Sequence, residues 1–511
     1  MAELHVITDL MAETRLEGDT ALSAYLETPA VVAVETRNDL GRVVVTTQDA
    51  GYGFTIVRES PVMVWRSCDW EDMVTKFKSL NDNDRQGVLD MYHPDLSSPT
   101  IAMLKTEAAV VARSLGVSVD LVHKLMAISN TNAHEYYGYE GQQFVEIESN
   151  AERIRSGKAA LFLFASKVAH SCLPNLTYTS KTSDGKLEYK VTRSLKAGDM
   201  LTFSYLDDLW ETPTHERRAK LKQSKSFTCC CIRCMGQDYA RPLPCTKCSG
   251  VVLCTSDTKN DPIWSCNQCS QCSHMENYLK TETDVELELR MWERKMQLDL
   301  SQCLPEALKR FMDRISSNLH PQHFLTLRAM KMYVRLCASH AAQMDRLHML
   351  GMPPQVVVTI KRRFGTPSKL YSEAARIGIS LVLRMECVAV GCLDHGSSER
   401  RGTEHPILQD AMTTIFHAAQ DLMRCPKSTW PNNAQAVVHS YIPAMRLQFG
   451  NSDSDVAEIE NKIPAPGIVD VSCSEVPTKP KGGTINVGGS SRKNNKKKGG
   501  STKKKHKNLR R

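Results

Sequence analysis

Cysteine spacing constrains the fold of this chain more than any other feature of its sequence. Ten of the 18 cysteines fall between residues 229 and 272. The pattern C-x2-C-x17-C-x2-C is formed by Cys245, Cys248, Cys266 and Cys269. This spacing is typical of zinc ribbons, in which four thiolates hold one zinc ion in a tetrahedron. We therefore expect a zinc ribbon, with a set of free thiols as the simpler alternative. Substitute ligands nearby are Cys254, Cys272 and His274.

A second group of cysteines is split along the chain. Cys172 lies in the polar turn H-S-C-L-P-N at residues 170–175, and Cys229 follows 57 residues later in the run F-T-C-C-C-I-R-C. A lone cysteine and a dense downstream cluster indicate a zinc site that closes across sequence distance. The first residues show no secretory signal, so we expect a reducing compartment and metal thiolates rather than disulfides.

The positive charge of the chain is confined to its C-terminal end. The formal net charge is +8, but the residues from Lys479 onward hold 13 Lys or Arg and no Asp or Glu, which leaves the remaining 52 basic and 57 acidic residues at about −5. This tail is rich in Ser, Gly and Lys, so we expect disorder from residue 451 to the end. We expect the tail to bind nucleic acid non-specifically or to direct nuclear entry, and the alternative is a tail that only increases solubility. The expected location of the protein is the nucleus, the cytoplasm or both. No apolar run approaches the length of a membrane helix, so no membrane partner is expected.

Apolar periodicity predicts an α+β chain of two or three domains. Residues 30–66 and 158–206 alternate like strands, whereas 70–128 and most segments after 280 show helical spacing. We expect Asp284 to cap a helix, followed by helices at 304–318, 321–342, 368–392, 405–424 and 433–448. These helices suggest a TPR-like array, although no clean repeat period is present. The expected segments are 1–29, 30–66, 67–127, 128–213, 214–280, 281–450 and the tail 451–511.

Several short motifs together resemble one enzyme family. The stretch Leu40-Gly41-Arg42 precedes I-V-R-E-S-P at 56–61, and Thr131-Asn132-Ala133-His134 follows the helical insert. H-S-C-L-P-N is then followed by G-D-M-L-T-F-S-Y at 198–205. This series resembles the SET domain of protein lysine methyltransferases, in the branch that contains the SMYD proteins.

The resemblance implies a β-rich SET domain in two halves, 30–66 and 128–213, closed by a zinc-bound post-SET segment. It implies an S-adenosylmethionine-dependent protein lysine methyltransferase, acting on a histone or another protein. Tyr205 would be the catalytic residue. The cofactor would contact Gly41, Arg42, Asn132, His170, Ser171 and Phe227, with Phe227 stacked on its adenine. The post-SET zinc would be held by Cys172, Cys229, Cys231 and Cys234, with Cys230 pointing away, so two zinc ions are expected in total.

The chain departs from the family pattern at three places. Val43 stands where the family has a second glycine, and Ala169 stands where it has an asparagine. Both changes are expected to weaken cofactor binding. Cys68 is the only cysteine between the E-x-P segment and Cys172, so we expect the MYND zinc finger of SMYD proteins to be missing. The alternative to an enzyme is therefore a catalytically weak or inactive SET scaffold that binds protein partners.

Overall fold

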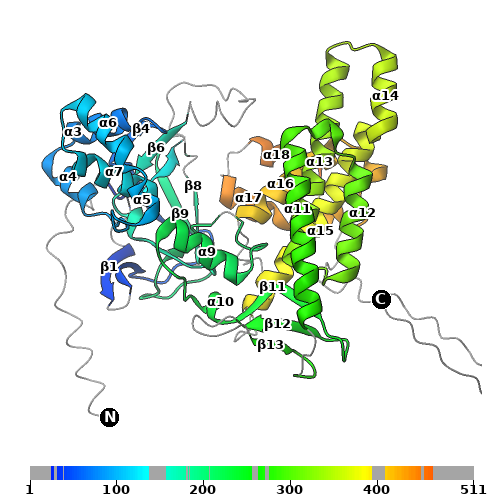
Figure 1. Cartoon of the computed structure of the whole chain (residues 1–511), viewed down its shortest axis with the longest axis horizontal. Helices are drawn as coiled ribbons and strands as arrows, with labels where there is room; N and C mark the ends of the chain where they lie inside the picture. The colour runs from blue at the N-terminus through cyan, green and yellow to red at the C-terminus, as the bar shows by residue number, and fades with distance from the viewer. Residues whose placement is uncertain are drawn as a thin grey trace, which may run out of the picture. The chain divides into compact units, whose positions relative to one another are not determined.

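The computed structural model describes most of the chain between residues 25 and 463 (Figure 1). The described ranges are 25–27, 31–37, 40–136, 157–179, 182, 184–206, 208–255, 263–270, 275–393, 409–449 and 454–463. The described residues all belong to one compact unit, residues 1–471. The basic tail lies outside the described residues.

Short strands build the first half of the described chain. They are β1 (Val32–Arg37), β2 (Gly41–Thr46), β3 (Thr55–Glu59), β4 (Met63–Arg66), β5 (His134–Tyr136), β6 (Lys158–Leu161), β7 (Ala169–His170), β8 (Leu176–Thr179), β9 (Leu187–Val191) and β10 (Thr202–Phe203). Their sheets run in the orders β1-β2, β3-β9-β8, β4-β6-β5 and β10-β7. All pairs are antiparallel except β7 with β10, which is parallel. The expected strand-like alternation is present in β9, where Leu187, Tyr189 and Val191 are all buried.

A group of helices lies between β4 and β5, as helical spacing predicted. These helices are α3 (Trp70–Ser79), α4 (Asp82–Leu89), α5 (Pro99–Ala102), α6 (Lys105–Leu115) and α7 (Val119–Asn132). Local chemistry marks their ends: the side chain of Asp69 accepts a hydrogen bond from the amide of Asp72, and Gly116 ends α6 at φ +63°. Cys68 is exposed just before α3. The lack of a MYND finger stays a prediction.

Glu59 joins the sheets through a buried carboxylate. Its two oxygens accept hydrogen bonds from the amides of Phe164 (2.6 Å) and Ala165 (2.8 Å), at the start of the 3-10 helix η2 (Ala165–Lys167). The side chain is fully buried, and this burial raises the pKa of Glu59 to about 7 even though the two amides favour the charged form. The glutamate of the E-x-P motif therefore fixes the segment that leads into β7.

The cysteine-rich segment forms a small three-stranded antiparallel sheet in the order β11-β12-β13. It follows the helices α9 (Thr214–Lys225) and α10 (Ile232–Met235), and its strands are β11 (Gln237–Pro244), β12 (Val251–Thr255) and β13 (Ile263–Cys266). The same hydrophobic core contains Cys172, Cys234 and Cys266 together with Leu308 and Phe311 of the later helices. The packing therefore continues across residue 280, and the expected domain boundaries stay a prediction.

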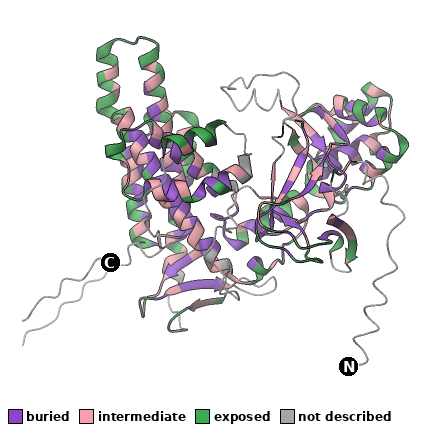
Figure 2. Ribbon diagram, turned by 180° about the vertical axis from the view of Figure 1, so that it is seen from behind, coloured by how far each residue is buried: buried purple, intermediate pink, exposed green. Residues whose placement is uncertain are grey.

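Helices make up the remainder of the described chain. They are α11 (Met275–Leu298), α12 (Pro305–Asn318), α13 (Phe324–Met349), α14 (Pro354–Phe364), α15 (Pro367–Leu393), α16 (Gln409–Met423), α17 (Ala434–Phe449) and α18 (Ser454–Lys462). Asp284 does not begin a helix, because α11 starts at Met275 and contains it. The helix α14 was not expected, and none of its residues is buried, as the green end of the α13–α14 hairpin in Figure 2 shows. The TPR-like character of this array stays a prediction.

The helix α18 lies within the range that we expected to be the tail. Val456, Ile459 and Ile463 are buried against α16 and α17, three or four residues apart, so this short helix has an apolar face to pack. Arg446 of α17 also forms an ion pair with Glu460. The helical packing thus extends to residue 463.

Two sets of charged contacts join the helices to the earlier part of the compact unit. Lys331 of α13 lies 2.7 Å from carboxylate oxygens of both Asp208 and Glu211. Glu282 of α11 receives hydrogen bonds from Arg241 of β11 (2.7 Å from Nε) and from His323 (2.8 Å). Burial alone would raise the pKa of Glu282, but the Arg241 and His323 contacts lower it to about 2, so it remains a carboxylate.

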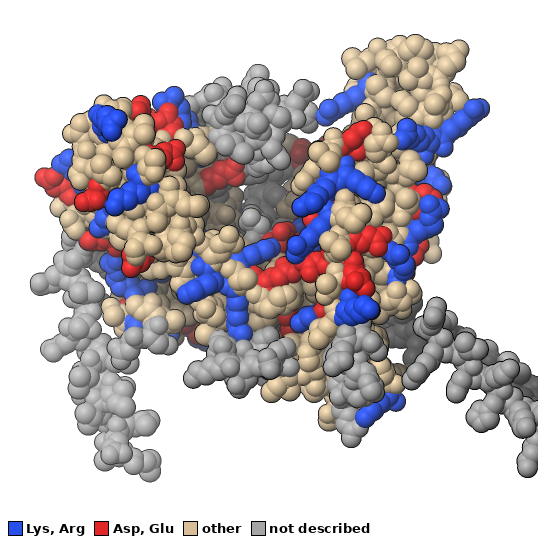
Figure 3. All heavy atoms as spheres, in the orientation of Figure 1, with Lys and Arg blue, Asp and Glu red and all other residues tan. Residues whose placement is uncertain are grey.

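Acidic and basic side chains are intermixed over the described surface in Figure 3. This agrees with a nearly balanced charge outside the tail. Among the described helices, none combines the length and hydropathy that crossing a membrane requires.

We predict that Glu59→Gln removes a pH dependence of stability. The raised pKa means that the folded protein holds a proton that the unfolded chain releases between pH 4.5 and about 7. The free energy of unfolding should therefore fall as pH rises through this window, by about 1.4 kcal/mol per pH unit from this group. Denaturant unfolding between pH 5.5 and 7.5 measures the slope.

The exposed Glu107 provides the matched control, since Glu107→Gln should keep the wild-type slope. An unchanged slope in Glu59→Gln would show that Glu59 is not the source of this pH dependence.

Candidate active site

The parallel pairing of β7 with β10 places the H-S-C motif beside the F-S-Y motif. Ala169 pairs with Thr202 and His170 with Phe203, and the amide of Ser171 donates to the carbonyl of Phe203 (3.1 Å). Two motifs about thirty residues apart in the sequence thus lie side by side.

Asn175, the last residue of H-S-C-L-P-N, holds this pairing in place. Its Oδ1 accepts from the amide (2.8 Å) and hydroxyl (3.2 Å) of Thr202, while its Nδ2 donates to the carbonyl of Met200 (2.8 Å). The side chain is buried, so an unpaired amide there would be costly. The asparagine is therefore a structural clamp of the motif.

The imidazole of His170 connects Tyr205 to the first cysteine group. The amide of Tyr205 donates to Nδ1 (3.0 Å), and Nε2 lies 3.2 Å from Sγ of Cys172. Burial lowers the pKa of His170 to about 4, although the nearby Cys231 opposes the shift. A neutral ring that accepts at Nδ1 carries its proton on Nε2, so it donates this proton to the sulfur of Cys172.

Tyr205 lies at the end of this pairing with its hydroxyl fixed. The hydroxyl donates to the carbonyl of Val168 (2.8 Å), and the ring packs 4.9 Å from the ring of Phe203 between centroids. Burial raises the pKa of Tyr205 well above its ordinary value, so the group is a neutral phenol at physiological pH. Such a group can orient a ligand through its dipole and does not act as a strong base.

Phe227 packs near the rings of His170 and Tyr205. Its ring lies 6.0 Å from His170 and 6.4 Å from Tyr205, edge-on to the latter. The chain reaches this position by a sharp reversal at Ser226, a left-handed residue at φ +63° that ends α9. The structure therefore brings together Tyr205, His170 and Phe227 from three separate motifs.

A pocket of about 540 Å³ opens at the predicted cofactor residues Gly41 and Arg42. Its wall also contains Tyr92, together with Ser166 and Lys167 of η2. Those two residues directly precede Val168, whose carbonyl accepts the hydroxyl of Tyr205. The volume lies in the range usual for small-molecule sites.

The side chains of the other two predicted cofactor residues form hydrogen bonds within the protein. Asn132 donates from Nδ2 to the carbonyls of Tyr92 and Ile128, both at 2.8 Å. The hydroxyl of Ser171 accepts from the amide of Leu173 (3.0 Å) within the turn. Asn132 therefore supports the pocket wall through Tyr92, and neither residue is among those that line the pocket.

Two residues that the sequence analysis did not single out connect the pocket with the aromatic group. The hydroxyl of Tyr92 donates to the carbonyl of Lys225 (3.4 Å), and the ammonium of Lys225 donates to the carbonyl of Thr131. This ammonium also lies 5.6 Å from the centroid of the Tyr205 ring. In the sequence, the one feature that could have indicated a role for Lys225 is its position two residues before Phe227.

The two departures from the family pattern differ in their surroundings. Val43 is 1% exposed, pairs with Glu35 between β1 and β2, and is not among the residues that line the pocket. Ala169 is half-buried in β7, directly before His170. The expected weakening of cofactor binding by Val43 and Ala169 stays a prediction.

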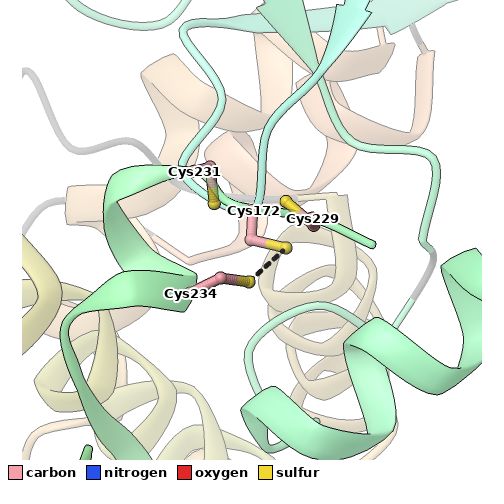
Figure 4. A group of neighbouring side chains, drawn as sticks. All are labelled: Cys172, Cys229, Cys231 and Cys234. Carbon is pink, nitrogen blue, oxygen red and sulfur yellow. Dashed lines mark hydrogen bonds between the residues drawn. The ribbon is translucent and has the colours of Figure 1, made fainter. Parts of the chain in front are cut away.

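The first cysteine group assembles as its spacing suggested. The ligand atoms of Cys172, Cys229, Cys231 and Cys234 all lie within 4.8 Å of one another, and their sulfurs point toward one another in Figure 4. The sulfurs of Cys172 and Cys234 are 3.5 Å apart. Cys230 is exposed and is not part of the group, as expected.

Two buried arginines lie beside this group. Arg217 is fully buried, and its Nη2 lies 3.8 Å from the sulfur of Cys234. Arg233 donates to the carbonyl of Cys172 (3.1 Å) and packs 4.1 Å above the ring of Trp210. A buried guanidinium requires a negative partner, which Asp238 supplies to Arg217 and which four thiolates around one Zn²⁺ would supply as well.

The second cysteine group lies at one end of this small sheet, where the turn between β11 and β12 meets the end of β13. The ligand atoms of Cys245, Cys248, Cys266 and Cys269 lie within 4.8 Å of one another. The amides of Lys247, Gly250 and Gln268 point at sulfurs of this group at 3.3–3.4 Å, as amides do around metal thiolates. Of the alternative ligands, Cys254 is buried on β12 outside the group, and Cys272 and His274 lie outside the described residues.

Both groups fit a zinc ion by donor chemistry and spacing. A Zn–S bond of about 2.3 Å in a tetrahedron implies sulfurs about 3.8 Å apart. The distances of 3.5 Å (Cys172 to Cys234), 3.8 Å (Cys245 to Cys269) and 3.5 Å (Cys248 to Cys266) are close to this value. Both clusters could therefore hold zinc, and the assignment of the eight cysteines as its ligands stays a prediction.

Known proteins resemble this chain over short segments. No protein-family model matches it. It is 37% identical over 89 residues to "Histone-lysine N-methyltransferase SMYD3" of Mus musculus, covering 17% of this chain and 20% of that protein. It is 36% identical over 81 residues to "N-lysine methyltransferase SMYD2" of Homo sapiens, covering 16% and 18%. It is 28% identical over 160 residues to "SET domain-containing protein SmydA-8, isoform A" of Drosophila melanogaster, covering 30% and 31%.

Its homologues are thus SET- and SMYD-type proteins, several named as lysine methyltransferases. The matches span less than a third of the length of each of these three relatives. Among solved structures, the SET domain of LSMT bound to lysine and AdoHcy aligns with 86% of this chain and 90% of that chain, at 9% identity and a TM-score of 0.27. This structural likeness is too weak to support an argument.

We predict two zinc ions per chain, and one in Gly250→Ala. A Cβ at residue 250 would lie 2.7 Å from the sulfur of Cys266, so the second cluster cannot keep its geometry. Elemental analysis of protein purified under reducing conditions measures the content.

Gly51→Ala is the matched control, because a Cβ there meets no atom within 4 Å, and it should keep both ions. A wild-type value near zero, or an unchanged value in Gly250→Ala, would refute the prediction.

Proposed function

We propose that this chain is an S-adenosylmethionine-dependent protein lysine N-methyltransferase. The observation that carries the proposal is the convergence of Tyr205, His170 and Phe227, from three separate motifs, beside a pocket lined by Gly41 and Arg42. The names of the SMYD relatives support the same reaction class.

The residues of the pocket suit a cofactor of this kind. Gly41 has φ +72° and a Cβ there would meet no atom within 4 Å, so its backbone faces open space. Arg42 donates to the carbonyl of Asp90 (2.8 Å) and keeps further donors for a carboxylate. Phe227 offers an aromatic face for a purine. When bound, S-adenosylmethionine would supply a methyl group from its sulfonium.

Tyr205 would position the substrate lysine. Its hydroxyl proton is held by the carbonyl of Val168, so the lone pairs of the oxygen can accept a hydrogen bond from an amine. The hydroxyl oxygen and this carbonyl together form a partly negative site that stabilises positive charge developing on a methyl group. Methyl transfer depends mainly on such alignment and on excluded water.

The alternative function is a zinc-stabilised scaffold that binds protein partners. Ala169 and the short extent of the matches to known enzymes favour it. Calorimetry with S-adenosylmethionine and S-adenosylhomocysteine separates the two functions. Absence of binding to folded, zinc-loaded protein would support the scaffold.

We further propose that the basic tail binds polyanions or directs nuclear entry. Its lysines and arginines would attract nucleic acid through counterion release, so affinity should fall steeply with salt. A chain ending at Ser474 should lose RNA binding and change its location while keeping its zinc. Unchanged RNA binding and unchanged location would leave the tail a solubilising segment.

We predict that Tyr205→Phe keeps cofactor binding and reduces methyl transfer at least about a hundredfold. The substitution keeps the ring packing and removes the hydroxyl that Val168 fixes. Radiolabelled methyl transfer to proteins of a cell lysate measures the loss.

Tyr189→Phe is the matched control. The ring of Tyr189 also packs against Phe203, but among the described residues its buried hydroxyl has no hydrogen-bond partner. This variant should keep full transfer and unfold no more easily than the wild type. Equal activity in both variants would remove Tyr205 from the mechanism.

A further inference from the structure

The hairpin formed by α13 and α14 is anchored at its base and exposed at its tip. The ring of Phe364, the last residue of α14, stacks on the ring of His340 with 4.2 Å between centroids, and Ile360 packs against the same core. The chain reverses at Gly351, a left-handed residue at φ +69°. Every residue from 350 to 356 is exposed to solvent. The base therefore holds the hairpin in place, while its tip has no packing partner among the described residues.

Large apolar side chains occupy this exposed tip. Met349 and Leu350, at the end of α13, are each 77% exposed, and Met352, Val356 and Val358 are exposed as well. Single exposed apolar residues are normal on a protein surface. Five of them within ten residues form a patch, and apolar patches of this kind mark sites of interaction.

The same hairpin is basic and contains no acidic residue. From residue 346 to residue 372 the chain has no Asp or Glu. The segment contains five basic residues, all exposed: Arg346, Lys361, Arg362, Arg363 and Lys369. Elsewhere on the described surface in Figure 3 the two signs of charge are intermixed. The charge of the hairpin is therefore complementary to an acidic partner.

The interleaving of basic and apolar side chains indicates the class of partner. Arg346 lies four residues before Leu350 on α13, so its cation is only about 6 Å from the tip along the helix axis. Val356 and Val358 lie about 200° apart around α14, on opposite flanks. A bilayer keeps its charged layer apart from its hydrocarbon and presents one flat face, so it would not fit this mixture.

Nucleic acid fits the tip no better than a bilayer does. Residues 346–363 contain no Phe, Tyr or Trp on which a base could stack, and the apolar side chains there are aliphatic. A protein segment can place carboxylates and apolar side chains in alternation, as an amphipathic helix does. The unbranched side chains of Met349 and Met352 can adapt to the shape of such a segment.

We propose that residues 346–363, the hairpin surface, are a docking site for an acidic amphipathic segment of a partner protein. The carboxylates of that segment would pair with Arg346 and with the cations of α14, while its apolar side chains would cover Leu350 and its neighbours. None of these residues lines the pocket at Gly41 and Arg42. The inference therefore stands apart from the proposed methyltransferase function.

The test measures the binding of a defined probe to the full-length, zinc-loaded chain by fluorescence anisotropy. The probe is a labelled peptide of about 20 residues, with Leu at helical spacing and Glu at the other positions. Leu350→Ser and Arg362→Glu should each weaken its binding about tenfold, because each removes one contact from the hairpin surface. Met349→Ser repeats the apolar test at the neighbouring residue.

A matched control variant lies outside the hairpin. Met103 is 76% exposed and Lys105 is also exposed, so the double variant Met103→Ser/Lys105→Glu removes the same two kinds of side chain from another surface. It should keep the wild-type affinity. A peptide of the same composition, scrambled so that it has no apolar face, measures how much binding comes from the basic tail, and it should bind all variants equally and more weakly.

The remaining outcomes overturn the inference. Equal affinity for the two peptides, or unchanged affinity in Leu350→Ser, shows that the hairpin attracts charge alone and is not a docking site. Binding of phosphatidylserine vesicles that is lost in Leu350→Ser, without binding of the amphipathic peptide, shows a membrane contact instead. Thermal unfolding and zinc content should match the wild type in every variant, because the substituted side chains are exposed.

Discussion

The parallel pairing of two very short strands, β7 and β10, is the constraint on which the candidate site depends. Two residues from each strand meet, and a pair of this size is too short to be stable by itself. The side chain of Asn175 supplies three further hydrogen bonds across it. Moving this pairing by one residue would turn the ring of His170 away from Tyr205.

Through His170, the same pairing couples the site to the first cysteine group. One ring nitrogen accepts from the backbone of Tyr205, and the other faces the sulfur of Cys172. An anionic sulfur favours a donor at that nitrogen, which leaves the opposite nitrogen as the acceptor. The orientation of Tyr205 is thereby linked to the charge on the cysteines, and the buried Arg217 and Arg233 lie beside the same group.

Features that depend on local chemistry could be predicted from the sequence. The ribbon set assembles as expected because its ligand spacing is a property of one short segment, whereas the set with Cys172 was expected from the family resemblance. The helices α12, α15, α16 and α17 lie within a few residues of the predicted ranges because their apolar faces repeat regularly. Periodicity reveals a face but not the beginning of a helix, which is why Asp284 falls inside α11. The contributions of Tyr92 and Lys225 depend on contacts between segments far apart in the sequence, and a lysine near a helix end usually faces solvent.

The two cysteine groups differ in how much of the chain must be ordered before they can close. The ribbon group spans Cys245 to Cys269, a segment that contains the paired strands β12 and β13, whereas the other group joins Cys172 to Cys229 across β8, β9, β10 and α9. Closing the longer loop costs more chain entropy, and it also requires the β7–β10 pairing to be in register. During synthesis the ribbon can therefore capture its metal as a local event, while the other group can be completed only after Tyr205 has reached its place. An ion bound by the group with Cys172 would therefore report that the candidate site has folded.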